Sequence, residues 1–286
     1  MEITKIGQIG GGQDGAIFGD LLFRFNAKGE GAVYDLSQKP VNGEGEFSLV
    51  SAFCLDRKDE IAPHSNSVFF GNEFYEEGDE FPLLYSNLYN NRRKEADRME
   101  GVTLVYRLTR EGKEFSTKLV QLIKIGFTED PLWRSENKAD VRPYGNCAID
   151  RENGIYYAFT MRDEDQKMRY FAFDLPKACA GEMDEKFGVP CVYLNKEDVK
   201  KSFDTPYQRY IQGACFHKGL IYSLEGFTDD EKNLPAMKIV DAEKGEQKEA
   251  YLFGDFSLTL EPELIDFYQD QCIYSDCEGN VYQLNF

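Results

Sequence analysis

Three short runs decide how this chain folds: Cys147-Ala148-Ile149, Gly154-Ile155-Tyr156-Tyr157-Ala158 and Tyr170-Phe171-Ala172-Phe173-Asp174-Leu175. Each run is apolar, and the second and third are rich in the aromatic residues that favour strands. Polar and glycine-containing segments separate the runs, as is typical of turns and loops. The runs therefore predict three consecutive strands of one small sheet.

The same order of strands recurs along the chain, in four further segments at residues 15–36, 67–108, 213–241 and 264–284. A fourth, outer strand is predicted after each of the first four units, at residues 47–55, 118–125, 189–194 and 248–253. The fifth unit stops at Phe286 without an outer strand, and residues 2–6 form a spare strand at the other end. Repetition of small sheets around an axis leaves only short, protected edges. The pattern predicts an all-β, five-bladed β-propeller whose N-terminal strand closes the last blade.

The predicted organisation is one domain over residues 1–286. Its blades cover approximately residues 13–60, 64–127, 144–200, 211–256 and 261–286, with residues 2–8 added to the last. Six blades would require strands within 126–143 or 177–210. The second of these segments contains the charged run 196–201 and is better interpreted as a helical or loop insertion. A pair of β-sandwiches is a weaker alternative.

The third strands carry a resemblance to known propellers. Val33-Tyr34-Asp35-Leu36 and residues 170–175 resemble third strands of WD-repeat-like and quinoprotein-like β-propellers, which often end near an Asp. The Gly-His and Trp-Asp signatures of WD repeats are absent, and Trp133 is the single tryptophan. The resemblance covers nearly the whole chain and implies the propeller fold without a specific family.

Composition narrows the classes of partner and the compartment. The formal net charge of −18 repels phosphate backbones, so nucleic acid is not an expected partner. No apolar run approaches the roughly 20 residues that span a bilayer, so no membrane association is expected. The seven scattered cysteines lack CxxC pairs and indicate buried thiols in a reducing compartment. We expect a cytoplasmic protein, while a trimmed leader would leave an exported form open.

Gly10-Gly11-Gly12-Gln13-Asp14-Gly15 matches the dinucleotide-binding pattern G-x-G-x-x-G, and Asp35 lies where a ribose-binding acid would stand. That motif requires a helix starting at the third glycine. Residues 16–25 instead contain Gly19-Asp20 between alternating aromatic residues, which predicts a hairpin. We therefore interpret the glycines as the crossing from the closing strand into the first blade.

Polar residues precede or begin each predicted inner strand, at the mouth of the central channel. The candidate ligand-binding residues are Asp14, His64, Asn66, Arg142, Tyr144, Asn146, Arg209, Gln212, Glu261 and Glu263. Each position alone is explained by a turn, but five polar segments that converge on one axis are a stronger observation. They predict a binding propeller that recognises a small polar ligand or a protein partner, with no clear catalytic signature.

The alternative is an enzyme that processes glycosides with Asp14 and either Glu261 or Glu263, since paired carboxylates can act as acid and base. Asp14 resembles the base of the five-bladed arabinanase and xylosidase group. Asn146 and Gln212 stand where those enzymes have acids, which is a departure from their pattern. The same oxygens could hold Ca²⁺, and no other metal site is expected. A mouth carboxylate pair about 5 to 10 Å apart would favour the enzyme, whereas Asp14 bonded to an Arg or a backbone amide would favour binding.

Three further side chains have open roles. His64 is either a turn residue bonded to a neighbouring carbonyl or a polar group of the mouth. Trp133 either covers the mouth as a stacking platform or anchors its own loop. His217, in a tight turn, is expected to be exposed and without a role.

Overall fold

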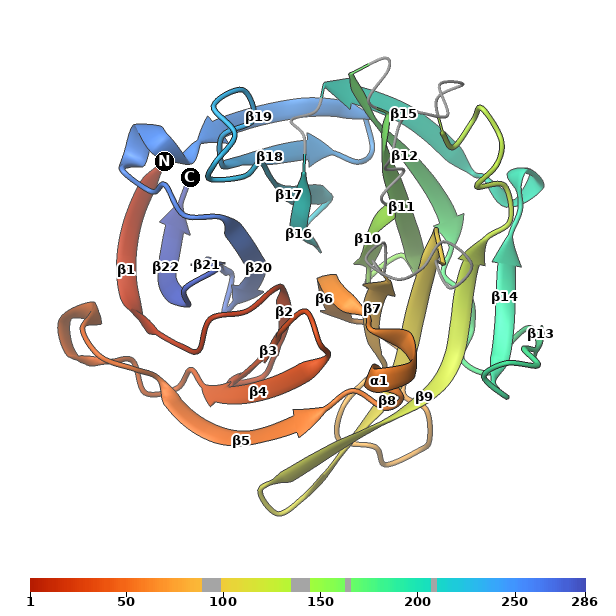
Figure 1. Cartoon of the computed structure of the whole chain (residues 1–286), viewed down its shortest axis with the longest axis horizontal. Coiled ribbons are helices and arrows are strands. Elements are labelled where there is room, and N and C mark those ends of the chain that lie inside the picture. The colour runs from red at the N-terminus through yellow and green to blue at the C-terminus, as the bar shows by residue number, and fades with distance from the viewer. Residues whose placement is uncertain (89–98, 135–144, 163–165, 207–209) are drawn as a thin grey trace.

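Short strands, most of them buried on both faces near the axis, build five sheets around that axis. The computed structural model shows the sheets as a ring (Figure 1). The structure describes residues 1–286 except 89–98, 135–144, 163–165 and 207–209. Side chains of neighbouring strand residues point to opposite faces. Val68 and Phe70 accordingly pack toward the first sheet, while Phe69 packs toward the third. The five-bladed β-propeller predicted from the repeat is confirmed.

Blades 1, 3 and 4 are antiparallel sheets of four strands. Blade 1 contains β2 (Gly15–Phe18), β3 (Leu21–Phe25), β4 (Glu30–Asp35) and β5 (Ser48–Cys54). Blade 3 contains β10 (Gly145–Asp150), β11 (Ile155–Arg162), β12 (Lys167–Asp174) and β15 (Lys201–Pro206). Blade 4 contains β16 (Ile211–His217), β17 (Leu220–Glu225), β18 (Ala236–Asp241) and β19 (Glu246–Leu252).

Blade 5 combines the two ends of the chain. It contains β20 (Pro262–Tyr268), β21 (Gln271–Asp276), β22 (Asn280–Asn285) and the N-terminal strand β1 (Glu2–Gln8). Strand β1 pairs antiparallel with β22 from Glu2↔Asn285 to Gln8↔Asn280. The predicted closure of the ring by the N-terminal strand is therefore present (Figure 1).

Blade 2 is larger than its neighbours. Its strands are β6 (His64–Phe70), β7 (Leu84–Leu88), β8 (Val102–Glu111), β9 (Glu114–Ile125), β14 (Pro190–Leu194) and β13 (Glu182–Met183). Strand β14 lies parallel to β9, with Cys191 opposite Leu122 and Leu194 opposite Ile125. The excursion that carries β13 and β14 covers the edge of β9, which would otherwise be exposed for pairing with another chain.

This arrangement corrects the prediction that residues 189–194 form the outer strand of blade 3. That strand is β15, which pairs with β12 and lies beyond the predicted blade boundary at residue 200. Strand β15 was missed because it is short and largely polar, with Thr205 as its one buried residue. The interpretation of residues 177–210 as a helical or loop insertion was also wrong, since the segment contains β13, β14 and β15. Only Lys196–Asp198, within the charged run, forms a 3₁₀ turn.

Five apolar clusters lie between successive blades, one at each junction. Between blades 1 and 2, for example, Phe23 packs edge-on against Phe70, Phe81 and Phe115 with ring centroids 5.3 to 5.7 Å apart. Burial of each such ring contributes about 1.5–3 kcal/mol to folding. The interior is thus divided into radial layers, which leaves the polar residues of the inner strands at the axis.

The remaining helical segments are short: α1 (Lys58–Ile61), and 3₁₀ turns at Val41–Gly43 and Phe253–Phe256. The glycine-rich segment before β2 contains no helix, and β2 pairs with β3 as a hairpin. A Cβ on Gly11 would lie 2.6 Å from the Cys277 carbonyl oxygen of blade 5, and one on Gly12 would lie 2.6 Å from that of Phe25. The glycines are required by this close crossing, as predicted, and the dinucleotide interpretation is excluded.

Candidate functional site

The five inner strands β2, β6, β10, β16 and β20 surround the axis (Figure 1), and β16 lies against β6, β10 and β20. Each inner strand places a polar residue at or next to its start. Asp14, Asn66, Asn146, Gln212 and Glu263 are all buried. The sequence therefore predicted correctly that polar side chains meet at this axis.

These polar residues join each blade to the next through hydrogen bonds. The Val68 amide of blade 2 donates to Asp14 Oδ2 at 2.9 Å, and Ser67 Oγ donates to the Cys147 carbonyl of blade 3 at 2.8 Å. Asn146 Nδ2 then donates to the Gln212 carbonyl of blade 4 at 2.6 Å. The blades are thus tied together by side chains as well as by apolar packing.

Blades 4, 5 and 1 complete the same ring. Gln212 Nε2 donates to Glu261 Oε1 at 2.6 Å. Gln13 Nε2 donates to Glu263 Oε1 at 3.0 Å, and the Ile17 amide donates to Asp266 Oδ2 at 2.7 Å. Every junction between blades therefore carries at least one side-chain hydrogen bond, and we call this set the axial ring.

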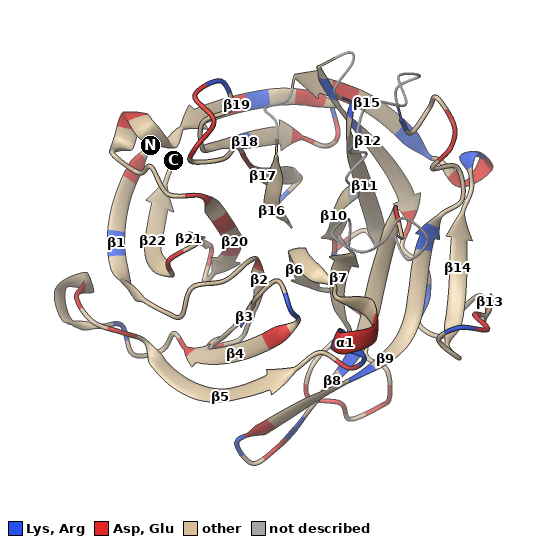
Figure 2. Ribbon diagram, in the orientation of Figure 1, with Lys and Arg blue, Asp and Glu red and all other residues tan. Residues whose placement is uncertain are grey.

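Within the axial ring, the part around blades 5 and 1 differs from the rest because it contains buried charge. Arg24 reaches inward from β3 and donates through Nη2 to the carbonyl oxygens of Gly12 at 2.7 Å and Asp276 at 3.0 Å. Its side chain is buried together with the carboxyl groups of Asp14 and Glu263, and Figure 2 shows the acidic segments of β20 beside the axis. We call Asp14, Arg24 and Glu263 the axial charged cluster.

Four buried polar atoms of this cluster have no hydrogen-bond partner among the described residues. They are Asp14 Oδ1, Glu263 Oε2, Arg24 Nε and Arg24 Nη1. Buried polar groups are normally paired with protein or water, so this concentration requires an explanation. Asp14 Oδ1 lies beside blade 4, where a Cβ on Gly213 would approach it to 2.9 Å.

The titration of the cluster reflects its burial. Burial raises the pKa of Asp14 and of Glu263 well above their ordinary values, and the Arg24 charge opposes the rise at both. Nearby acids add to the rise, since a second negative charge is unfavourable: Glu261 and Asp14 raise the pKa of Glu263, and Asp266 raises that of Asp14. Arg24 remains protonated at neutral pH although burial lowers its pKa. One guanidinium therefore faces two carboxyl groups, an arrangement that favours retention of a proton by the acids.

A half-exposed rim separates the cluster from solvent. Gln13 and Glu261 are both partly accessible, and each is bonded to a buried partner, Glu263 and Gln212 respectively. Burial raises the pKa of Glu261 as well. His64 begins β6 with a left-handed φ of 62°, followed by Ser65 at 48°. Such backbone conformations are costly for non-glycine residues and often mark functional positions.

Three of the predicted site residues, Arg142, Tyr144 and Arg209, lie outside the described residues. Asn66 belongs to the ring through a long contact of 3.5 Å from Nδ2 to the Ile211 carbonyl oxygen. Within the described part of the chain, no group of three or more His, Cys, Asp or Glu side chains could hold a metal ion. The calcium site considered as an alternative use of the mouth oxygens therefore has no such ligand set there.

The structure decides between the two interpretations of Trp133 and corrects the expectation for His217. Trp133 is fully buried, stacks on Phe171 with centroids 5.7 Å apart, and donates to Glu100 Oε1 at 2.9 Å. It is a loop anchor and not a platform for a ligand. His217 is not idle, since its ring stacks on Phe267 at 3.7 Å and its Nε2 lies 3.4 Å from Asp270.

Arg24 and Asp266 are the axis residues that the sequence analysis missed. Each is a charged residue inside an otherwise apolar run, in Leu22-Phe23-Arg24-Phe25 and Leu264-Ile265-Asp266-Phe267. A charge at a position whose neighbours are all apolar was the available signal, because buried charges require partners.

Comparison with known proteins does not identify a family for this chain. No family model matches the chain, and no curated protein matches it. Solved structures similar to it include glutaminyl cyclase from Myxococcus xanthus, with 8% identity, coverage of 100% of this chain and 94% of that one, and a TM-score of 0.48. The computationally designed Ika8 protein has 9% identity, coverage of 99% and 100%, and a TM-score of 0.37.

The Dos1 propeller is 12% identical, with a TM-score of 0.36, and the match covers 95% of this chain and 57% of that one. At identities and TM-scores this low, no activity of those proteins carries over. No helix in the described part of the chain has the length and apolarity needed to cross a membrane. The fold alone does not assign a function, so any function has to be argued from the side chains.

Proposed function

We propose that this chain is a binding propeller that holds a small, neutral polar ligand at the channel mouth, on the side where blades 5 and 1 meet. The single observation that supports this best is the set of unpartnered buried atoms on Asp14, Arg24 and Glu263. A hydroxyl group can donate to a carboxylate oxygen and accept from a guanidinium N–H, so polyhydroxy compounds match both kinds of atom. Gln13 and Glu261 form the rim over which such a ligand would enter.

The state of Asp14 favours binding over glycoside hydrolysis. Its Oδ2 accepts a hydrogen bond from the Val68 amide and thereby joins two blades, which is a structural task. A hydrolase also needs a second carboxylate with room for a sugar ring or water between the two groups. The raised pKa values of Asp14, Glu261 and Glu263 are a feature that suits a general acid, so an enzyme remains the second candidate.

A protein partner that covers the mouth is compatible with the same residues, whereas nucleic acid is opposed by the net charge of −18. The resemblance to WD-repeat-like and quinoprotein-like propellers agrees with a binding role. All seven cysteines are free thiols, which agrees with a cytoplasmic location in a reducing environment.

A ligand-observed NMR screen with pentoses, hexoses and glycerol tests the proposal. Hits should compete with one another, and Gln13→Ala should weaken them about fivefold or more, since it removes the hydrogen bond to Glu263 Oε1 at the rim. Gln283→Ala, a glutamine replacement on β22, is the matched control and should leave affinity unchanged. Hits that bind Gln13→Ala as tightly as the wild type would contradict the proposed location.

Hydrolysis is tested separately with aryl pentosides. Turnover by the wild type that is lost in a folded Glu263→Gln variant would favour the glycoside-processing enzyme over the binding propeller. Absence of turnover, together with saturable sugar binding, is the result that the binding proposal predicts.

A further inference from the structure

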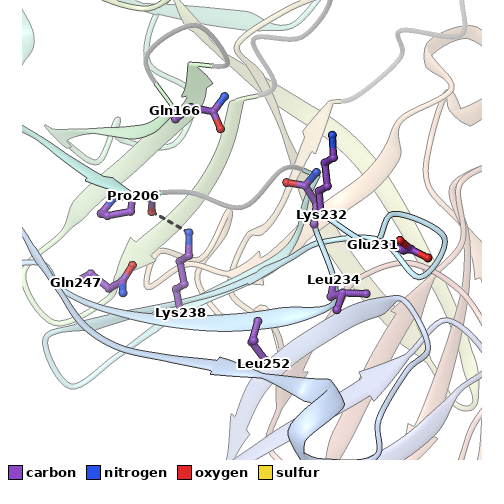
Figure 3. Close-up of a pocket in the computed structure, with 9 residues that line it drawn as sticks. Gln166, Pro206, Glu231, Lys232, Leu234, Lys238, Gln247 and Leu252 are labelled. Carbon is purple, nitrogen blue, oxygen red and sulfur yellow. Dashed lines mark hydrogen bonds between the residues drawn. The ribbon is translucent and has the colours of Figure 1, made fainter.

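A pocket of about 480 Å³ lies away from the axis, between the outer parts of blades 3 and 4. Its walls include Pro206 at the end of β15, Lys238 on β18, and Gln247 and Leu252 on β19 (Figure 3). The loop before β18 adds Leu234. This volume lies within the range of about 300–1,000 Å³ that is common for small-molecule sites.

Lys238 provides a buried hydrogen-bond donor in this pocket. Its Nζ lies 2.7 Å from Glu225 Oε2, and the side chains of the pair are 7% and 0% exposed. The same Nζ donates to the Pro206 carbonyl oxygen at 2.8 Å (Figure 3). An ammonium group has three N–H donors, so one remains beyond these two contacts. The charge of Lys238 is already balanced by Glu225, so the pocket needs a neutral acceptor and not a counter-ion.

Gln247 provides a complementary acceptor. Its Oε1 is buried and has no hydrogen-bond donor among the described residues. Gln247 stands opposite Val240 in the pairing of β18 with β19, two residues along the strand from Lys238. Side chains in this diagonal relation on one face are within reach of the same bound group. Both residues also line the same pocket in Figure 3.

The surroundings argue against an anion and for an apolar part in the ligand. The loop beside the pocket contains Asp229, Asp230 and Glu231 against a single Lys232. Leu234 and Leu252 line the pocket and are 41% and 46% exposed. An apolar group resting on these two leucines would remove that surface from water.

We propose that this pocket binds a small neutral molecule that carries a carboxamide group next to an aliphatic or aromatic group. The amide oxygen accepts from Lys238 Nζ, the amide N–H donates to Gln247 Oε1, and the apolar part covers Leu234 and Leu252. This site is independent of the axial charged cluster and of the ligand proposed there.

The test compares two nearly isosteric probes, N-acetyl-leucinamide and N-acetyl-leucine, by protein-observed NMR titration of the full chain. We expect saturable millimolar binding of the amide, as suits so small a ligand. N-acetyl-leucine should bind about tenfold more weakly than the amide. Its carboxylate adds a negative charge beside an acidic loop and lacks the terminal N–H donors. Equal affinity for both probes, or no saturable binding of the amide, would overturn the proposal.

Variants locate the binding. Gln247→Ala should weaken binding of the amide about fivefold or more without changing the melting temperature, because Oε1 has no donor to lose among the described residues. Gln283→Ala on β22 and Gln13→Ala at the axis are the controls and should both leave amide affinity unchanged. Lys238 variants are avoided because they would leave Glu225 buried without its cation. Unchanged affinity in Gln247→Ala would place the amide elsewhere and overturn the proposal.

Discussion

The two halves of the axial ring perform the same task with different chemistry. At the junctions of blades 2, 3 and 4 the bridging groups are neutral, as in Ser67 and Asn146, and their bonds run to backbone carbonyls. At the junction of blades 5 and 1 the groups are charged, as in Asp14, Arg24 and Glu263. Among the described residues of the ring, the neutral half leaves one buried atom unpartnered, Asn66 Oδ1, whereas the charged half leaves four.

This difference separates structural polar groups from candidate binding groups. A neutral amide or hydroxyl that bridges two strands has little bonding capacity left, so it adds stability and uniqueness to the ring. A buried guanidinium with five N–H donors, or a carboxylate with two oxygens, is rarely satisfied by one or two backbone contacts. The same position in the repeat thus serves closure in one half and leaves buried polar atoms without partners among the described residues in the other.

The largest expected effect is loss of the central cation. Arg24→Met would leave Asp14 and Glu263 buried without the charge that opposes their pKa rise, and would remove the bonds to Gly12 and Asp276. We expect destabilisation by about 3–5 kcal/mol, measured by urea denaturation near neutral pH.

Adding Glu263→Gln to that variant should recover part of the loss, because one of the stranded acids becomes neutral. If Arg24→Met were as stable as the wild type, the two acids would not depend on the guanidinium, and the charged half would resemble the neutral one.

The matching change in the neutral half should cost less. Asn146→Ala removes the bond to the Gln212 carbonyl and the one accepted from the Cys147 amide. Unpairing these buried groups should lower the free energy of unfolding by about 1–3 kcal/mol. The same denaturation experiment measures it, and a loss as large as that of Arg24→Met would erase the contrast between the halves.

Dependence on pH should occur in the charged half alone. A carboxyl group whose folded pKa is raised contributes stability that is present below the unfolded pKa and is lost as pH rises through the folded pKa. Burial raises the pKa of Glu263 in this sense. The permanently neutral Glu263→Gln variant should therefore gain stability relative to the wild type as pH rises, by up to about 1.4 kcal/mol per pH unit.

Melting curves of both proteins at several pH values above 4 measure this gain, with Asn146→Ala as a reference that should keep a constant offset. A gap between Glu263→Gln and the wild type that is flat over the same range would mean that Glu263 titrates as an ordinary glutamate.

The smallest expected effect on stability belongs to the rim. Gln13 is half-exposed and bonded through one contact to Glu263 Oε1, so Gln13→Ala should cost about 0.5–1.5 kcal/mol in the absence of ligand. Thermal denaturation gives this value. A loss larger than that of Asn146→Ala would mean that the rim, and not the ring beneath it, holds blades 5 and 1 together.

Much of the fold was predictable because strands, turns and their repetition are local features of the sequence. The inner strands, the hairpin formed by Gly15–Phe18 and Leu21–Phe25, and the closure by Glu2–Gln8 all follow from such patterns. The blade of β14 was not predictable, because its apolar residues suit any sheet. Only the pairing of Cys191 with Leu122 assigns this strand to blade 2. A local pattern predicts a strand but not its partner.

The site was predictable in place but not in detail. Polar strand starts led to Asp14 and Glu263, since such residues recur at the same position of each unit. Arg24 lies on a second strand, and its approach to the axis depends on how β3 packs behind β2. Which atoms remain unpartnered depends on distances of a few tenths of an ångström, and these are properties of the folded ring.

The most direct test of this contrast is a ¹³C-carboxyl NMR titration of the wild-type protein that follows Glu263, with the surface residue Asp241 as an internal reference. The account predicts a midpoint for Glu263 clearly above the ordinary glutamate value of about 4.3, and one for Asp241 below the ordinary aspartate value of about 3.9. A midpoint for Glu263 at or below the ordinary glutamate value would show a carboxyl group that is hydrated or fully paired. It would contradict the claim that buried carboxyl and guanidinium atoms at the junction of blades 5 and 1 lack hydrogen-bond partners among the described residues.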